Sequence, residues 1–251
     1  MKILAFETSA KAASAALLED GRLLGEYYQN SGQTHSRTVM KLAKDLLDNC
    51  ELSPAELDLI AWANGPGSFT GVRIGAAAAK GLCWGRELPC VPVSTLEAMA
   101  WSAGAWEGPV CCCMDARRSQ VYNAIFTREN GSLRRLREDR AISIEELAAD
   151  LECFSEPVLL VGDGALLVHD TLCAGRAAPE CSSVGADAHI GPARRLVLAP
   201  EFLRQQRASG VALAAWAALQ AGAAPVSASA VVPNYLRLSQ AERERLARET
   251  P

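Results

Sequence analysis

The predicted order of strands and helices repeats once along the 251-residue chain, and this repeat restricts the possible folds more than any other feature. Residues 2–84 show three strand patterns, then a helix, a strand and a helix, and residues 110–173 show the same series again. Each half has a hairpin signal between its second and third strands, Asp20-Gly21 in the first and Asn130-Gly131 in the second. The pattern predicts two α/β lobes of similar topology, although the halves share no evident sequence identity.

The predicted elements also indicate how the first lobe is built. Strands 2–8, 13–19 and 22–29 read as an antiparallel meander, whereas the apolar segment 59–63 is typical of a central parallel strand. The sheets are therefore expected to be mixed. Longer helices are expected at 34–50, 69–84, 95–103, 143–151, 192–206 and 208–222, with Pro200 breaking or kinking the one at 192–206. Short helices are expected after the cap Ser53 and, after the turn Gly162-Asp163-Gly164, up to Cys173.

These elements predict an N-terminal lobe at 1–105, a C-terminal lobe at 106–238 and a charged tail at 239–251. Apolar residues make up 49% of the chain, so it can bury a large core, and the net charge of −4 argues against an autonomous nucleic-acid-binding protein. The longest strongly apolar stretch, Val211 to Leu219, is too short to span a membrane, and Glu7 interrupts any signal-peptide core. We expect a soluble cytoplasmic protein.

Cysteine and histidine spacing argues against metal chemistry. The nine cysteines include no C-x-x-C pair, and Cys111, Cys112 and Cys113 are consecutive in an apolar strand pattern, so we expect buried, reduced thiols. The three histidines, His35, His169 and His189, show no H-x-x-x-H spacing. We therefore expect neither a zinc site nor any other metal.

A glycine-proline loop at 64–73 joins a predicted strand to a predicted helix, and two interpretations apply. Free N–H groups at the helix start, together with Arg73, could bind a phosphate. The segment lacks the Gly-Lys-Ser/Thr ending of a Walker A loop, so a tight turn between strand and helix is favoured.

The helix after this loop carries small residues at Gly71, Gly75 and Ala78. Intrinsic helix propensity is poor at the glycines, so packing must hold the helix. Either it is a core helix, or its smooth surface receives a helix of a partner protein.

Acidic residues end the first strand of each half. Glu7, followed by Thr8 and Ser9, closes one strand, and Asp115 closes its counterpart. Carboxylates in these places could hold Mg²⁺ beside a nucleotide phosphate. No glycine follows either acid closely, so capping and turn roles are the alternative interpretation.

The chain resembles the YeaZ-type (TsaB) family of accessory proteins in bacterial tRNA threonylcarbamoyladenosine synthesis. The resemblance is dense over residues 1–125 and thin from 130 to 230. It rests on ILAFETS (3–9), QTHS (33–36), GPGSFTGVRIG (65–75), STLEA (94–98), DAR (115–117) and PNYLR (233–237). It implies the two-lobed actin/Hsp70/sugar-kinase-like fold, built here from two β-β-β-α-β-α units.

The resemblance also implies a noncatalytic scaffold subunit. The catalyst would be a TsaD-type relative that modifies the tRNA adenosine beside the anticodon. The further expected partners are a TsaE-type ATPase and a second copy of the chain, with tRNA reached only through the complex. No tightly bound cofactor is expected, and ATP or ADP is expected only in the assembled complex.

The same resemblance supplies candidate site residues. The expected partner interface comprises His35, Ser36, Val39, Leu42, Leu46, Gly71, Arg73, Ile74, Gly75, Ala78 and Leu82. The family loop comprises Gly65, Pro66, Gly67, Ser68, Phe69 and Thr70, and a vestigial nucleotide site would comprise Glu7, Thr8, Ser9 and Asp115.

Two rival functions stay open on the residues. An ATP-dependent small-molecule kinase of the same fold would use Glu7 and Asp115 to bind Mg²⁺-ATP. A glycoprotease-type metalloprotease would need clustered metal ligands, which the histidine spacing does not offer.

Overall fold

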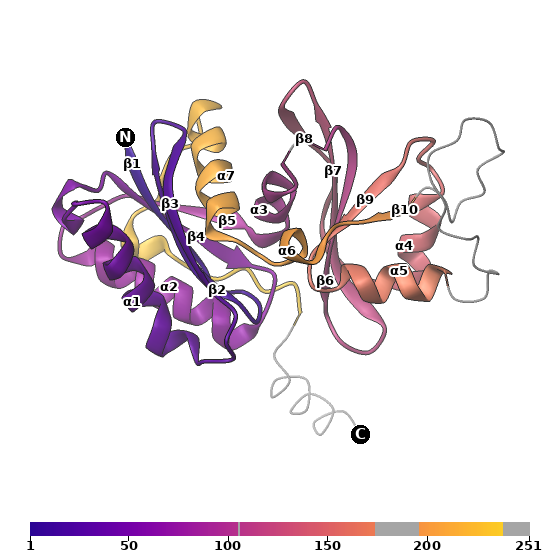
Figure 1. Ribbon diagram of the computed structural model, residues 1–251, viewed down its shortest axis with the longest axis horizontal. Helices are drawn as coiled ribbons and strands as arrows, with labels where there is room; N and C mark the ends of the chain where they lie inside the picture. The colour runs from indigo at the N-terminus through magenta and orange to yellow at the C-terminus, as the bar shows by residue number, and fades with distance from the viewer. Residues whose placement is uncertain (105, 174–195, 238–251) are drawn as a thin grey trace.

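Two five-stranded mixed sheets with one common topology form the framework of the molecule (Figure 1). The computed structural model describes residues 1–104, 106–173 and 196–237. The first sheet has the order β3-β2-β1-β4-β5. Its strands are β1 (Lys2–Glu7), β2 (Ala13–Glu19), β3 (Arg22–Gln29), β4 (Leu59–Gly65) and β5 (Cys90–Ser94).

The second sheet repeats this topology. Its order is β10-β9-β6-β7-β8, which is the first order read from the opposite edge. In each sheet the central strand is antiparallel to the next strand of the chain and parallel to the fourth strand of its unit. This duplication confirms the expected α/β fold class of two lobes with mixed sheets. The strands are β6 (Gly108–Asp115), β7 (Gln120–Glu129), β8 (Ser132–Ser143), β9 (Val158–Val161) and β10 (Leu196–Leu198).

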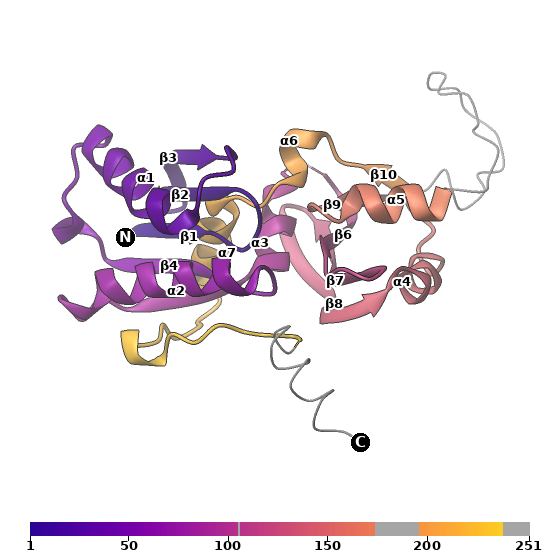
Figure 2. The ribbon, with the colours of Figure 1, turned by 90° about the horizontal axis from the view of Figure 1, so that it is seen from below.

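Each sheet carries two helices on its outer face. Helices α1 (His35–Asn49) and α2 (Phe69–Trp84) lie side by side over the first sheet (Figure 2). Their apolar faces bury Val39, Leu46 and Ala79 against the sheet. Helices α4 (Ile144–Leu151) and α5 (Ala165–Cys173) cover the second sheet in the same way.

Two further helices fill the space between the sheets, and each packs on the sheet of the other half. Helix α3 (Thr95–Ser102) follows β5 but packs largely on the second sheet. Helix α7 (Ala208–Gln220) follows β10 but packs on the first sheet, where Val211 and Ala215 are fully buried. The two helices also pack on each other (Figure 1).

The prediction that residues 106–238 form one C-terminal lobe is therefore wrong for its last part. Helix α7 is apolar on nearly all sides, so it needs cover from both α3 and the first sheet. After it, a segment that we call the C-terminal strap (residues 226–237) runs back along the first lobe. Val226 forms a β-bridge with Cys90, and Val231 is buried in the first core. The strap includes the 3₁₀ helix η3 (Ala228–Ala230).

The predicted helix at 192–206 is also wrong where the structure describes it. Residues Leu196–Leu198 form the edge strand β10, and α6 is a single turn at Glu201–Arg204 with Pro200 at its N-cap. A short 3₁₀ helix, η1 (Pro54–Glu56), has Ser53 as its N-cap. The tail at 239–251 lies outside the described residues. No helix in the described ranges has the length and apolar character needed to cross a membrane.

A polar network fastens the two lobes where α3 begins. Ser94 Oγ donates to Asp139 Oδ2 on β8 at 2.5 Å, and Arg135 Nη2 donates to Glu97 Oε2 at 2.8 Å. Arg135 also pairs with Asp139 and lies over the ring of Phe126. All four polar side chains are shielded from much of the solvent, so the network favours one fixed arrangement of the lobes.

Candidate functional site

A cleft of about 690 Å³ opens between the lobes, at the carboxyl ends of β1 and β6. The structure brings together here three segments that the sequence analysis singled out separately: the end of β1, the family loop, and the turn after β6. It adds Asp163 after β9, which was missed, and the C-terminal strap, whose PNYLR motif (233–237) supported the family resemblance but was given no place in a site. The lining includes Ser9, Lys11, Gly67, Ser68, Phe69, Asp115, Arg117, Asp163, Glu201, Asn234, Tyr235 and Arg237.

Glu7 is buried completely beneath the cleft. Its Oε1 accepts a hydrogen bond from the Ser9 N–H at 2.5 Å, and its Oε2 has no hydrogen-bond partner among the described residues. Burial raises the pKa of the Glu7 carboxyl from 4.5 to about 7, and the nearby charge of Asp163 adds to this rise. A carboxyl in this setting is partly protonated near neutral pH.

Asp163 lies in the second lobe at the position that the family loop occupies in the first, directly after the fourth strand of its unit. Burial is the main cause that raises its pKa, and Gln206 Nε2 donates to its Oδ1 at 2.9 Å. Asp115 is more exposed, and its Oδ1 accepts a hydrogen bond from the Arg117 N–H at 2.7 Å. The duplicated topology is the signal that could have identified Asp163.

The family loop makes a tight turn from β4 into α2. The Ser68 N–H donates to the Ser9 carbonyl at 2.6 Å, and Ser68 Oγ accepts from the Gly71 N–H to cap α2. A Cβ atom at Gly67 would lie 2.5 Å from that same Ser9 carbonyl. At Gly65, where φ is +115°, a Cβ would lie 2.3 Å from the Asn234 carbonyl of the strap. The loop is therefore closed over the end of β1.

Gly71 and Gly75 of α2 face into the molecule rather than outward. Thr8 Oγ1 donates to the Gly71 carbonyl at 2.8 Å, and a Cβ at Gly71 would lie 2.0 Å from the Thr8 carbonyl. A Cβ at Gly75 would lie 2.6 Å from Thr8 Oγ1. These glycines let α2 approach the end of β1.

The expected partner interface needs correction for four of its residues. Val39, Leu46, Gly71 and Gly75 are buried within the chain, so they cannot contact a partner. The error arises because helical spacing identifies an apolar face without showing what covers it. Ser36 and Arg73 are exposed, whereas the others are half-buried: His35, Leu42, Ile74, Ala78 and Leu82.

Aromatic stacking attaches the strap to α2. The rings of Phe69 and Tyr235 stack at 4.3 Å between centroids, and the Arg73 guanidinium lies 4.0 Å from the Phe69 centroid. Arg73 Nε donates to Tyr235 Oη at 2.9 Å. At the end of the strap, Arg237 Nη1 donates to the Ala116 carbonyl at 2.6 Å, which ties the strap to the second lobe.

The outward side of α1 and α2 carries two large exposed apolar residues that the sequence analysis did not assign to an interface. Met40 is 43% exposed, and Trp84 is 73% exposed at the end of α2. Between the helices runs a small apolar groove of about 90 Å³, lined in part by Met40, Leu47 and Leu82. We call Met40, Ala77, Gly81, Leu82 and Trp84 the α1–α2 surface.

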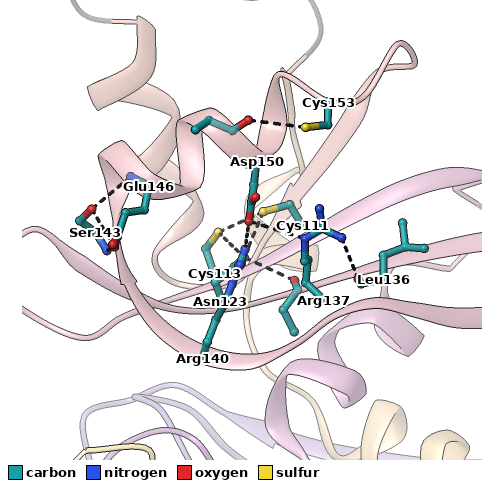
Figure 3. A network of polar contacts seen from close by, with 12 residues as sticks. Cys111, Cys113, Asn123, Leu136, Arg137, Arg140, Ser143, Glu146, Asp150 and Cys153 are labelled. Carbon is teal, nitrogen blue, oxygen red and sulfur yellow. Dashed lines mark hydrogen bonds and ion pairs between the residues drawn. The ribbon is translucent and has the colours of Figure 1, made fainter.

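The three consecutive cysteines are buried as predicted. Cys111, Cys112 and Cys113 are fully buried free thiols in β6. Asn123 Nδ2 donates to the Cys112 carbonyl at 2.9 Å, and Arg140 Nη2 donates to Asn123 Oδ1 at 3.0 Å (Figure 3). The prediction is wrong for Cys153, which is exposed, and Cys50 and Cys173 are half-buried. Within the described ranges no three His, Cys, Asp or Glu side chains gather as a metal site would require.

Comparisons with a family model and with curated relatives point to the same group of proteins. The family model described as "TsaD: tRNA N6-adenosine threonylcarbamoyltransferase" matches residues 26–245. The "tRNA threonylcarbamoyladenosine biosynthesis protein TsaB" of Bacillus subtilis is 33% identical over 96% of both chains. The protein of the same name from Escherichia coli is 34% identical over 65% of this chain and 72% of its own.

A solved structure agrees with these sequence matches. "YeaZ from Pseudomonas aeruginosa" superposes with a TM-score of 0.74 at 26% identity, covering 94% of this chain and 99% of that one. Fold, family loop and full-length similarity lead to one conclusion: the chain belongs to the TsaB (YeaZ) family of tRNA threonylcarbamoyladenosine biosynthesis proteins.

Proposed function

We propose that the chain is a noncatalytic subunit that docks on a TsaD-type threonylcarbamoyltransferase through the α1–α2 surface. The observation that carries the proposal is the apolar character of this surface, which no described part of the chain covers. The transferase family model matches most of this chain, so a TsaD-type partner has counterparts of α1 and α2. Two such helix pairs can pack against each other about an approximate two-fold axis.

The helix geometry of the α1–α2 surface suits this kind of contact. Ala77 and Gly81 are exposed on α2, and a Cβ added at Gly81 would meet nothing within 4 Å. Small side chains let a partner helix come close, while Met40 and Trp84 offer apolar area at the sides. In the absence of the transferase, the same surface would pair two copies of this chain. A TsaE-type ATPase and tRNA would then join the assembly rather than the isolated subunit.

Replacing Met40 with glutamate should weaken binding to the transferase at least tenfold, because the new charge would lose water on docking. The folded subunit should keep its thermal stability, since Met40 is already 43% exposed. Light scattering during size-exclusion chromatography would detect the complex, and calorimetry would give the affinity. Leu166→Glu is the matched control, because Leu166 is 46% exposed on the other lobe. Equal affinity of Met40→Glu and the wild type would refute the docking surface.

We further propose that the isolated subunit neither binds Mg²⁺-ATP tightly nor turns it over. The Ser9 carbonyl is packed against the family loop and the Thr8 carbonyl against Gly71 in the first turn of α2, so the turn after β1 has little room to wrap phosphates. Glu7 below that turn is buried and partly protonated near neutral pH, which suits it poorly to bind Mg²⁺. Calorimetry of the subunit with Mg²⁺-ATP should show no binding at micromolar concentrations. Tight binding with turnover would favour the kinase alternative.

A further inference from the structure

Two buried thiols face each other where α2 meets β5. Cys83 lies in the last turn of α2, and Cys90 is the first residue of β5. Their Sγ atoms are 3.0 Å apart, and both residues are fully buried. A disulfide bond is about 2.05 Å long, so the sulfurs need to approach by only roughly 1 Å.

The local fold holds these thiols together. After α2 the chain doubles back, and the N–H groups of Arg86 and Leu88 both donate to the Cys83 carbonyl at 3.2 Å. Cys90 exchanges two backbone hydrogen bonds with Val226 of the strap, at 2.8 and 2.7 Å. The pair therefore sits where the end of α2, the first sheet and the C-terminal strap meet.

A second close pair, Cys111 and Cys113, provides a contrast within the same chain. Their Sγ atoms are 3.5 Å apart, but they lie two residues apart on one face of β6 (Figure 3). Cβ atoms in that relation are about 6.5–7 Å apart, whereas a disulfide needs about 3.5–4.5 Å. This pair cannot be bridged without distorting β6.

We propose that Cys83 and Cys90 form a redox-sensitive pair that closes into a reversible disulfide and fastens the end of α2 to β5. The oxidant is a low-molecular-weight disulfide. One cysteine thiolate attacks it, forms a mixed disulfide and releases the first small thiolate. The second cysteine thiolate attacks the protein sulfur and releases the other small thiolate. In the protein two S–H bonds are lost and one S–S bond forms, while the S–S bond of the oxidant breaks and its two halves leave as thiols, having taken up two electrons and two protons.

The oxidant reaches the pair through the connection that precedes β5. Trp84, Gly85, Arg86 and Glu87 are exposed, so opening this segment uncovers the thiols without disturbing the sheet. The bond closes a short loop, which restricts the unfolded chain and should raise the Tm by about 5 °C. This proposal does not depend on the docking role proposed above.

To test the pairing, the full-length protein is refolded from urea in glutathione buffers that contain an increasing fraction of oxidised glutathione. Because the chain starts unfolded, burial does not keep the oxidant from Cys83 and Cys90. Free thiols are then alkylated, and the protein is digested with trypsin and a glutamate-specific protease. The expected product joins peptide 81–86 to peptide 88–97, with a mass two hydrogens below their sum, and dithiothreitol separates them. Peptide 108–117, which contains Cys111 and Cys113, should be alkylated at every cysteine.

Variants separate this pairing from general oxidation. Cys83→Ala and Cys90→Ala should each abolish the joined peptide and the Tm difference between oxidised and reduced protein. Cys153→Ser should retain both, because Cys153 is exposed and remote from the pair in the sequence. Cys83 and Cys90 recovered as separate alkylated peptides from the most oxidising buffer would overturn the proposal. A joined peptide without any rise in Tm would overturn the fastening role.

Discussion

Glu7→Gln is expected to stabilise the folded protein at pH 8 by about 3 kcal/mol, because it removes a charge from a buried site. Burial, opposed in part by the hydrogen bonds to Ser9, raises the pKa of the Glu7 carboxyl from 4.5 in the unfolded chain to about 7 in the folded protein. Between these pH values the folded state binds more protons, so its stability falls as pH rises. Above about pH 7 the full penalty is present. Below about pH 4.5 both states are protonated and the penalty vanishes.

Urea denaturation of wild type and variant at pH 5 and pH 8 would measure this difference. The gain in the free energy of unfolding should be large at pH 8 and small at pH 5. The glutamine keeps an oxygen for the Ser9 N–H. Glu138→Gln is the control, since the Glu138 side chain is 88% exposed and its replacement should change little at either pH. If the Glu7→Gln protein is no more stable than the wild type at pH 8, the ionised Glu7 carboxylate does not destabilise the folded protein.

Gly71→Ala is expected to destabilise the protein by about 3 kcal/mol, although alanine has a higher helix propensity than glycine. The new Cβ would lie 2.0 Å from the Thr8 carbonyl, which is backbone directly after β1 and cannot move aside. Helix α2 would have to shift away from β1 and give up the hydrogen bond from Thr8 Oγ1 to the Gly71 carbonyl. Most of the loss should therefore come from the contact between α2 and β1.

Gly81→Ala in the same helix is the matched control. A Cβ at Gly81 meets nothing within 4 Å, so helix propensity alone should stabilise the protein by about 0.5–1 kcal/mol. Thermal and urea denaturation of the two variants should move in opposite directions. Equal stability of the two variants would contradict the close packing of Gly71 on Thr8.

The strand and helix patterns predicted much of the local structure. Helices 34–50 and 69–84 are observed as α1 and α2 to within a residue at each end, and the hairpins fall at Asp20-Gly21 and Asn130-Gly131. These features depend on apolar spacing, caps and turn residues, which neighbouring residues determine. The positions of Glu7 and Asp115 at the same cleft also followed from the repeat, because equivalent strands end at equivalent places.

Other features depend on contacts between residues far apart in the chain. The inward direction of Gly71 and Gly75 depends on Thr8, and the pairing of Cys83 with Cys90 depends on how the chain turns back after α2. The placement of α7 on the first sheet gave no local signal, because an apolar helix can pack against any open apolar surface.

The sequence by itself thus determined which segments are strands and helices, their repeated order, and the family loop between β4 and α2. Only the tertiary structure decided which faces are already covered, and so which are free for a partner. Val39 and Met40 are both apolar residues of α1, and residue type alone does not show which of them is covered. Long-range packing decides the difference: the chain's own sheet covers Val39, whereas Met40 stays exposed and is free to contact a partner.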